Sequence, residues 1–450
     1  MQPGEIVGGR WRILREAGHG GMGTVFRAAE TKDETPVAIK VLRRTESLDD
    51  AIASGRFARE VELLSALDDP RIVRYVAHGV TPAGRPFLVE EWIEGSSLGE
   101  VLDADGLTAG ETARVIAEVA AGLAVAHAHG IVHRDVKPDN VMFVGGDLAR
   151  VKLIDFGIAR RGDEAFPITR TGTFVGTPGY VSPEQARGSH TLDGRSDLFS
   201  LGCVLYQCLT GRPPFAGRTV TAVRAKVLLY EPPPVSVFAQ IPDALEALVG
   251  KLLAKSALDR PADAQALADA IAPFVTLGGP RRPTHVTGQT HALPRGTSTD
   301  LDTLVTSDTR EGGVLACVVI AEASGPVGAS RLRAAIAGYG GRLEELFGQT
   351  VLVTASPTLL PSEQVVVAAR CALAIRPMVA GPIVLSGVGD KPTTDTISIA
   401  LDDGVNTLAK ASAQPELEDR VIVERAFAAP LRDAGFAIDQ DDRGTTFLRA

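Results

Sequence analysis

The sequence predicts an α+β protein in which a strand-rich lobe, a helical lobe and a smaller α/β domain follow one another along the chain. Short β-like runs, such as Val37–Val41 and Phe87–Val89, occupy the chain up to about residue 93. Helical periodicity then dominates from Leu98 to about Phe274. Strand-like and helix-like segments alternate from residue 312 onward, as a compact α/β domain requires.

Individual elements follow from the same periodicities. One helix-like segment, about Ala51 to Leu67, interrupts the first strands, and the apolar run Val314–Ile320 is a buried-strand candidate. The other amphipathic segments predict helices at Thr112–His129, Asp197–Leu209, Ala244–Ala254, Ser330–Tyr339 and Glu363–Ile375.

The stretch from about Thr276 to Asp308 differs from both of its neighbours. It is rich in Pro, Gly, Thr and Arg, and its few apolar residues follow no period. Such a composition is typical of a flexible linker. The predicted organisation is therefore a first domain at residues 8–275, a linker at 276–311 and a second domain at 312–450.

The bulk composition is that of a globular protein with room for two or three domains. Of the 450 residues, 45% are hydrophobic and 22% are charged. The formal net charge of -9 and the pI near 5.5 argue against general binding to nucleic acid or to anionic membranes.

Cysteine usage and the lack of targeting segments predict a cytoplasmic protein. The four cysteines are too few and too scattered for a disulfide framework and match no common zinc spacing, so we expect buried free thiols in a reducing compartment. The first residues lack the basic and apolar parts of a signal peptide. No apolar run approaches the ~20 residues needed to span a bilayer.

A glycine-rich segment near the amino terminus predicts a phosphate-binding loop. The residues Gly18-His19-Gly20-Gly21-Met22-Gly23-Thr24-Val25 follow the pattern Gly-x-Gly-x-x-Gly-x-Val. Glycines let backbone N–H groups approach phosphate oxygens, although a mobile turn or a dinucleotide fingerprint would use the same residues. A dinucleotide site needs a helix directly after its glycines. Here the strand Val37-Ala38-Ile39-Lys40 comes next, which makes Lys40 a candidate contact of the α- and β-phosphates.

The most informative stretch is His133-Arg134-Asp135-Val136-Lys137-Pro138-Asp139-Asn140, followed by Asp155-Phe156-Gly157. It places a candidate base, a cation and two potential Mg²⁺ ligands in one polar segment. Phosphoryl transfer requires such a set, because its transition state spreads negative charge over phosphate oxygens that metal and lysine must offset. A plain surface loop would not specify all these positions. The stretch resembles the catalytic loop of the bacterial eukaryotic-like serine/threonine protein kinases.

The resemblance covers about residues 8–272 and implies a bilobal protein kinase fold that uses ATP with Mg²⁺ or Mn²⁺. In that family, the residue at Asp135 orients the substrate hydroxyl and accepts its proton, and Lys137 lies beside the γ-phosphate and indicates Ser or Thr acceptors. Asn140 and Asp155 are the implied Mg²⁺ ligands. The residues implied to contact ATP are Gly18, Gly20, Gly23, Val25, Ala38, Lys40, Glu91 and Ile93.

Two further glutamates matter to the pocket in this resemblance. Glu60 matches the helix glutamate that holds Lys40 by an ion pair, although Glu62 or a plain surface charge would also fit the pattern. Glu90 is a departure, because the family usually has an apolar residue at the back of the pocket. A buried carboxylate there would need a partner, so we expect an altered pocket shape.

The segment between Asp155 and Glu184 resembles an activation loop. Three alternating threonines lie in it, namely Thr169, Thr171 and Thr173. They are either solvated loop residues or autophosphorylation sites, and the first two best match the phosphorylated threonines of bacterial kinases. A phosphate there would bind Arg134 and so order the segment.

Three more residues have structural roles in the resemblance. The stretch Gly176–Glu184 resembles the family's substrate-docking stretch; Glu184 at its end is implied to pair with Arg260, and Asp197 is implied to brace the catalytic loop. None of the family's central polar residues is missing, which argues against a pseudokinase.

The second domain resembles the class III nucleotidyl cyclases less closely. The segment Val318–Gly325 is similar to their first metal-site strand, and the implied architecture is ferredoxin-like. Two-metal nucleotidyl transfer needs paired carboxylates, whereas four positions depart from the cyclase pattern: Glu322, Glu345, Gln349 and Lys410. We therefore expect no cyclase activity and predict dimerisation or ligand sensing, with a plain α/β domain as the alternative.

The sequence as a whole predicts a serine/threonine kinase that phosphorylates itself and other proteins in intracellular signalling. Its expected partners are proteins with Ser or Thr acceptors and a second copy of the chain, bound through residues 312–450. Neither nucleic acid nor a membrane span is expected. The alternatives are a signalling scaffold whose interactions depend on nucleotide, and a bifunctional kinase and nucleotidyl cyclase.

Overall fold

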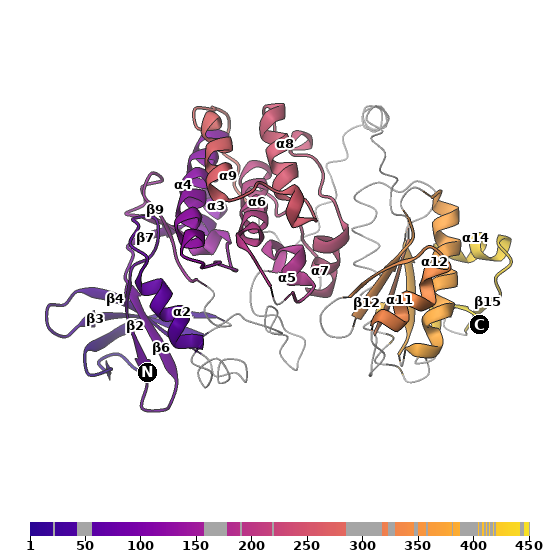
Figure 1. Cartoon of the computed structure of the whole chain (residues 1–450), viewed down its shortest axis with the longest axis horizontal. Helices are drawn as coiled ribbons and strands as arrows, with labels where there is room; N and C mark the ends of the chain where they lie inside the picture. The colour runs from indigo at the N-terminus through magenta and orange to yellow at the C-terminus, as the bar shows by residue number, and fades with distance from the viewer. Residues whose placement is uncertain are drawn as a thin grey trace. The chain divides into compact units, whose positions relative to one another are not determined.

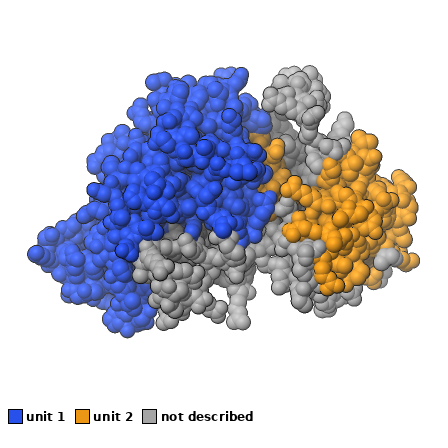
Figure 2. Space-filling model, viewed as in Figure 1, with its two compact units in different colours: residues 1–215, 234–285 blue, residues 216–233, 286–450 orange. Residues whose placement is uncertain are grey.

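The structure, a computed structural model, divides the chain into two compact units (Figures 1 and 2). Unit 1 comprises residues 1–215 and 234–285, and unit 2 comprises residues 216–233 and 286–450. The residues that the structure describes are 1–20, 23–42, 56–156, 178–189, 191–217, 220–284, 317–322, 329–345, 350–356, 359–379, 381–387, 404, 407–408, 411, 414, 417, 420–441 and 445–449.

Unit 1 begins with a six-stranded antiparallel sheet in the order β1-β2-β3-β4-β6-β5. Its strands are β1 (Ile6–Val7), β2 (Trp11–Gly20), β3 (Gly23–Glu30), β4 (Pro36–Leu42), β5 (Tyr75–Val80) and β6 (Pro86–Glu91). The strands predicted at residues 37–41 and 87–89 are confirmed as the central parts of β4 and β6.

The alternation of side chains along β4 separates the core from the pocket. Val37, Ile39 and Val41 are buried in the apolar core on one face of the sheet. Ala38 and Lys40 alternate with them, so they point to the opposite face, where both line a cavity. One strand thus carries both a core stripe and part of the candidate site.

Helix α2 (Arg56–Ser65) is held to this sheet by a second apolar cluster. Val61 of the helix is buried together with Leu42 of β4 and Leu88 of β6. Leu42 alternates with Val41 and therefore shares the face of Lys40, so α2 lies over the face of the sheet that holds the lysine. The helix predicted from residue 51 is described from Arg56 onward.

The second lobe of unit 1 is helical (Figure 1). Its helices are α3 (Leu98–Ala104), α4 (Ala109–Ala128), α5 (Pro183–Ala186), α6 (Gly194–Thr210), α8 (Asp243–Leu252) and α9 (Ala264–Ile271). The predicted helices of this lobe are confirmed as α4, α6 and α8. Every residue of α6 from Ser196 to Thr210 is buried, so this helix forms the centre of the lobe. In the described part of the chain, no helix is both long and apolar enough to cross a lipid bilayer.

A three-stranded sheet has two of its strands where the sequence predicted mainly helix. Its strands are β7 (Gly95–Ser97), β8 (Val141–Val144) and β9 (Val151–Leu153), in the order β7-β8-β9. Runs of three or four residues are too short for periodicity to reveal them. The catalytic loop leads directly into β8, and Asp155 follows β9 by two residues, so this sheet sets the spacing of the site.

The predicted linker, residues 276–311, is described as far as Thr284, and this first part packs against unit 1. We call residues 276–284 the strap. The Thr284 N–H donates to the Leu102 carbonyl oxygen at 2.6 Å, and the Arg282 N–H donates to that of Leu107 at 3.3 Å. Backbone hydrogen bonds to α3 and its following turn therefore order a segment whose composition is that of a linker.

Unit 2 contains α7 (Val220–Leu229) and a seven-stranded sheet in the order β11-β12-β10-β13-β14-β16-β15. Its elements after α7 are β10 (Cys317–Glu322), α11 (Ala329–Ala337), β11 (Arg342–Glu345), β12 (Thr350–Thr354), α12 (Pro361–Ile375), β13 (Ile383–Gly387), β14 (Val421–Val423), α14 (Ala428–Asp433), β15 (Ile438–Gln440) and β16 (Thr446–Leu448). Residues of α11, α12, β10 and β12 share one buried core, so both helices cover the same face of the sheet. The strand and the two helices predicted here are confirmed as β10, α11 and α12.

Candidate active site

A cavity of about 650 Å³ lies in unit 1 between the six-stranded sheet and the catalytic loop. It is lined by residues that come from distant parts of the sequence. Those singled out by the sequence are Gly18, Gly23, Val25, Ala38, Lys40, Glu90, Glu91, Ile93, Asp135, Lys137, Asn140 and Asp155. The described fold thus gathers most of the predicted site around one space.

The glycine-rich hairpin forms one wall of this cavity. Gly18 of β2 is opposite Val25 of β3 in the register, and Gly20 is opposite Gly23. Gly23 has a φ of +154°, and a Cβ added there would lie 2.0 Å from the Val41 carbonyl oxygen, so only glycine fits. A Cβ at Gly18 would meet nothing within 4 Å, which leaves its backbone open to a ligand. Residues 21 and 22 at the turn lie outside the described residues.

Lys40 and Asp155, 115 residues apart and both lining the cavity, form an ion pair. The Lys40 Nζ donates to the Asp155 Oδ1 at 2.8 Å. Burial by itself lowers the pKa of Lys40, but the charge and hydrogen bond of Asp155, together with the charges of Glu90 and Asp135, raise that pKa above its ordinary value. The lysine is therefore charged at neutral pH, as a phosphate contact must be.

Glu60, the predicted ion-pair partner of Lys40, lies in α2. Its side chain is outside the described side chains, so this pairing stays a prediction. The alternative, Glu62, is exposed on the same helix.

Asp135, Lys137 and Asn140 form one hydrogen-bonded group. The Lys137 Nζ donates to the Asp135 Oδ2 at 3.0 Å. The Asn140 Nδ2 donates to the backbone carbonyl oxygen of Asp135 at 2.7 Å and to its Oδ2 at 3.1 Å. A single 3₁₀ turn, Pro138–Asn140, brings the asparagine back to the aspartate.

The backbone of the catalytic loop is held by Asp197, a fully buried residue of α6. Its two carboxylate oxygens accept hydrogen bonds from the N–H groups of His133 and Arg134, each at 2.8 Å. The His127 Nε2 lies 2.7 Å from one of them. Arg134 has a φ of +66°, which costs energy for a residue other than glycine. The bonds to Asp197 hold it in this conformation.

His133 has a structural role in this loop. Its ring centroid lies 4.4 Å from that of Phe156, and its Nε2 is 3.0 Å from the Ile154 carbonyl oxygen. Burial lowers the pKa of His133, so the imidazole is neutral and its Nε2–H donates to the carbonyl. The histidine thus joins the catalytic loop to the segment that carries Asp155.

Strand β6 ends at Glu91, and Trp92 and Ile93 leave the sheet along the cavity wall. The Glu91 Oε1 pairs with Lys152 and accepts the Arg74 N–H at 2.8 Å. Because the glutamate side chain is used in this support, a bound base would meet backbone atoms of the segment.

Glu90 lies at the back of the same cavity. It is opposite Ala38 in the register of β4 and β6 and is half-buried. The pKa of Glu90 is raised to about 7, mainly by burial. The negative charge of Asp155 also raises this pKa, and the positive charge of Lys40 lowers it. This carboxyl therefore changes charge near neutral pH, unlike the apolar residue usual at this position.

The predicted phosphorylation sites Thr169, Thr171 and Thr173 lie outside the described residues, as do Gly157 and the rest of residues 157–177. The described structure resumes at Pro178. Ser182 caps α5 by accepting the Gln185 N–H at 3.3 Å, so its hydroxyl has a local structural role.

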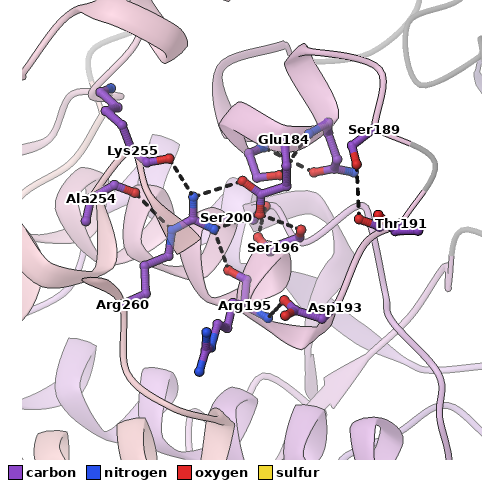
Figure 3. Close-up of polar contacts among 12 residues, drawn as sticks. Glu184, Ser189, Thr191, Asp193, Arg195, Ser196, Ser200, Ala254, Lys255 and Arg260 are labelled. Atoms are coloured by element: carbon purple, nitrogen blue, oxygen red, sulfur yellow. Dashed lines mark hydrogen bonds and ion pairs between the residues drawn. The ribbon is translucent and has the colours of Figure 1, made fainter. Parts of the chain in front are cut away.

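Glu184 and Arg260 are brought together by the helical lobe (Figure 3). The two terminal nitrogens of Arg260 donate to the two carboxylate oxygens of Glu184 at 2.7 and 2.9 Å, and the Ser196 Oγ donates to the carboxylate at 2.6 Å. Burial by itself would raise the pKa of Glu184, but the hydrogen bonds and charge of Arg260, together with the hydrogen bond from Ser196, lower that pKa. The pair anchors the end of the substrate-docking stretch to α6.

Sequence reasoning missed three supporting side chains: His127 beside Asp197, Lys152 beside Glu91, and Gln185. The Gln185 Nε2 donates to the Arg134 carbonyl oxygen at 2.9 Å, which links α5 to the catalytic loop. The pattern Ser182-x-x-Gln185 is that of a capping box and could have located this turn. No local pattern could have paired His127 or Lys152 with partners 61 to 70 residues away.

The donor set of the cavity fits Mg²⁺ delivered with a nucleotide. Among the described residues, no group of three or more His, Cys, Asp or Glu side chains could hold a metal alone. Asp155 and Asn140 offer hard oxygen atoms on the cavity wall, and Mg²⁺ is commonly held by one or two such ligands plus substrate phosphates. Asn140 uses its Nδ2 to bind Asp135, so its Oδ1 would be the metal ligand.

Four positions of unit 2 depart from the cyclase pattern. Glu322 and Glu345 end strands β10 and β11, but their side chains are outside the described side chains. Gln349 and Lys410 lie outside the described residues.

Comparison with known proteins places this site in a family. A model of the protein kinase domain matches residues 11–271. The serine/threonine-protein kinase pkn3 of Myxococcus xanthus is 38% identical over 272 residues, which cover 58% of this chain and 49% of that protein. PknB of Mycolicibacterium smegmatis is 41% identical over 253 residues, covering 55% of this chain and 40% of that protein.

A third relative, the serine/threonine-protein kinase Pkn1 of Myxococcus xanthus, is 38% identical over 266 residues, covering 58% of this chain and 38% of that protein. The chain spans half or less of the length of these curated relatives. The family model covers more than half of the chain and contains every residue that lines the cavity. The chain therefore belongs to the protein kinase family.

Proposed function

We propose that this chain is a serine/threonine protein kinase that transfers the γ-phosphoryl group of ATP to hydroxyl groups of proteins. The observation that carries the proposal is the convergence of Lys40, Asp135, Asn140 and Asp155 on one cavity. Two of them, Lys40 of β4 and Asp155 after β9, are joined by an ion pair. A purely structural set of polar residues would not need to line a space of about 650 Å³.

The geometry of the catalytic loop supports a positioned base. Asp135 would accept the hydrogen bond of the incoming hydroxyl and later its proton, while Asn140 fixes the orientation of the carboxylate. Lys137, 3.0 Å from that carboxylate, brings a positive charge to the place where a transferred phosphoryl group would carry negative charge. The residue type at position 137 is what favours Ser and Thr over Tyr as acceptors.

ATP would lie with its base against residues 91–93 and its phosphates between the glycine-rich hairpin and Lys40. Mg²⁺, when bound with the nucleotide, would neutralise charge on the phosphates. Asp155 and the Asn140 amide oxygen would hold it.

Autophosphorylation of Thr169 and Thr171 is part of the proposal. Incubation of the full chain with γ-labelled ATP and Mg²⁺ or Mn²⁺, followed by mass spectrometry, tests activity and sites together. Label on these threonines that disappears in Asp135→Asn supports the proposal. Purified wild-type chain that transfers no label to itself or to an added protein contradicts it.

For unit 2 we propose a ferredoxin-like, cyclase-related domain that promotes self-association and so phosphorylation in trans. Support comes from the succession β10-α11-β11-β12-α12-β13, whose strands pair in the order β11-β12-β10-β13 with all three pairings antiparallel. Sedimentation of the full chain tests self-association, and a monomer at all concentrations contradicts it. Chromatography of reactions with ATP and GTP tests the expectation that no cyclic nucleotide is formed.

A further inference from the structure

A chain of buried side-chain hydrogen bonds joins the strap to the substrate-docking segment. The Tyr180 hydroxyl donates to the Gln207 Oε1, and the Gln207 Nε2 donates to the Thr284 Oγ1 at 3.3 Å. Tyr180 lies in the described part of the docking stretch, Gln207 lies on α6, and Thr284 is the last described residue of the strap. One glutamine side chain thus contacts two segments that are more than 100 residues apart.

All three side chains are buried, with 7% of Tyr180, 7% of Gln207 and 8% of Thr284 exposed. Burial raises the pKa of Tyr180, so its hydroxyl is protonated and able to donate. A buried amide that loses one hydrogen-bond partner is destabilised, because it has been removed from water and nothing replaces the lost hydrogen bond. The position of the strap therefore affects the energy of the Gln207 amide, and through it the hydrogen bond to Tyr180.

The lobe is shaped to receive the strap. A Cβ added at Gly110 of α4 would lie 2.2 Å from the Leu277 carbonyl oxygen, and one added at Gly106 would lie 2.1 Å from the backbone of Arg282. Both glycines permit an approach that any side chain would block. The Arg281 guanidinium also bonds the Gly106 carbonyl oxygen at 3.1 Å. The strap is thus a docked element.

The strap also bridges a cavity of about 290 Å³. Gly278, Gly279 and Pro280 line it on one side, and Cys208 and Leu209 of α6 line it on the other. The strap therefore contacts the lobe on either side of Gly278–Pro280, through the Leu277 carbonyl beside Gly110 and the Arg282 N–H bonded to Leu107.

We propose that Gln207 is a positioning residue through which the docked strap holds the substrate-docking segment, so that affinity for the protein acceptor depends on the strap. The inference rests on the proposed kinase function. Because the strap leads into the rest of the linker and then into residues 312–450, any event there that pulls on residue 285 would act on the acceptor site through this route. The ATP pocket has no part in the route.

Steady-state kinetics of the full chain test the proposal. Two acceptors are used, the full-length Asp135→Asn chain and dephosphorylated casein, and KM for the acceptor, KM for ATP and ATP turnover without acceptor are measured. Thr284→Val keeps the shape of the side chain and removes its hydroxyl. We expect it to raise KM for the acceptor about three- to tenfold, as the loss of one buried hydrogen bond does, with KM for ATP unchanged.

Matched variants define the cause. Thr276→Val makes the same chemical change at an exposed strap position and is expected to have no effect, whereas Thr284→Ser keeps the hydroxyl and is expected to stay within about twofold of wild type. Tyr180→Phe breaks the route at its other end. In a double-mutant cycle, Tyr180→Phe/Thr284→Val should raise KM for the acceptor no further than the larger single effect.

Several results would overturn the inference while leaving the proposed function intact. One is a folded, active Thr284→Val chain whose KM for the acceptor is unchanged. A second is a rise in KM for ATP in this variant that equals the rise in KM for the acceptor. A third is a double variant in which the two single fold-changes in KM for the acceptor multiply. If Thr284→Val fails to fold, the Tyr180→Phe chain alone must still raise KM for the acceptor selectively. A wild-type chain that phosphorylates neither acceptor contradicts the proposed function instead.

Discussion

The side-chain amide of Asn140 donates to both the backbone carbonyl and the carboxylate of Asp135, at 2.7 and 3.1 Å. The candidate metal ligand therefore also orients the candidate base. Phosphoryl transfer depends chiefly on positioning and electrostatics. Asn140 contributes to positioning by orienting the Asp135 carboxylate, and it would contribute to electrostatics by holding the metal ion.

Asp135→Asn should reduce phosphoryl transfer by about 10²- to 10⁴-fold, the usual contribution of a positioned general base. ATP binding should be retained, because Asp135 is placed to meet the acceptor. Label incorporation and calorimetric titration with ATP measure the two effects separately. Asp147→Asn, the same change at an exposed turn after β8, serves as control and should be as active as wild type. Equal loss in both variants would contradict the assigned role.

Lys40→Met should lower kcat by about 10²- to 10³-fold, the cost of removing one preorganised electrostatic contact. It also leaves Asp155 without the cation 2.8 Å away that offsets its charge. Single-turnover transfer with saturating ATP measures the effect. Lys32→Met changes an exposed lysine in the turn between β3 and β4 and is the matched control. Full activity in Lys40→Met would contradict the assignment of Lys40 as a phosphate contact.

Arg260→Leu should lower the free energy of unfolding by up to about 3 kcal/mol, because it leaves the Glu184 carboxylate, only 19% exposed, without its charged partner. Arg12→Leu breaks the exposed ion pair with Glu34 and should cost at most about 1 kcal/mol. Urea unfolding followed by circular dichroism measures both. Similar losses of unfolding free energy in the two variants would show that the pair between Arg260 and Glu184 stabilises the fold no more than an exposed ion pair does.

The same pair predicts a pH dependence. The pKa of Glu184 is lowered from its ordinary value of 4.5, so the folded state binds the proton more weakly than the unfolded state does. The stability that the pair contributes is thus fully present above about pH 4.5 and is lost as the pH falls below it. The difference in unfolding free energy between wild type and Glu184→Gln should shrink toward acid pH. A difference that grows toward acid pH would reverse the assigned sign.

Glu90 predicts the opposite dependence. Its pKa is raised from 4.5 to about 7, so the folded state holds the proton more tightly, and stability is lost as the pH rises through this interval. Above pH 7, Glu90→Gln should be more stable than wild type by up to about 3 kcal/mol, and the difference should shrink as the pH falls toward 4.5. Glu62→Gln, at an exposed position on α2, should show no such trend. Thermal unfolding between pH 4.5 and 8 is the measurement.

The sequence predicted the residues of the candidate site better than it predicted the side chains that hold those residues in place. Asp135, Lys137 and Asn140 lie within six residues, so local spacing and one short turn nearly determine their geometry. The Glu184–Arg260 pair could be predicted only through the family resemblance, because 76 residues separate its members. His127 beside Asp197 and Lys152 beside Glu91 depend on how helices and strands pack, which no local pattern encodes.

The strap shows a second limit of prediction from sequence. Its composition indicated a linker, and composition was a fair guide to its lack of helix or strand. Its order comes from backbone hydrogen bonds to Leu102 and Leu107 and from glycines on the opposing surface. Neither feature leaves a periodic trace in residues 276–284, so periodicity could not reveal the docking.

Docking of the strap also moves the point at which this fold can be joined to other sequences. The last helix of the lobe, α9, ends at Ile271. A recombination event that cut there would discard Thr284 and uncover the surface of α3 and α4 that the strap protects. A cut after residue 284 would leave the lobe whole. Exchange of accessory domains during evolution, and gene fusion in the laboratory, should therefore succeed beyond this residue and fail before it.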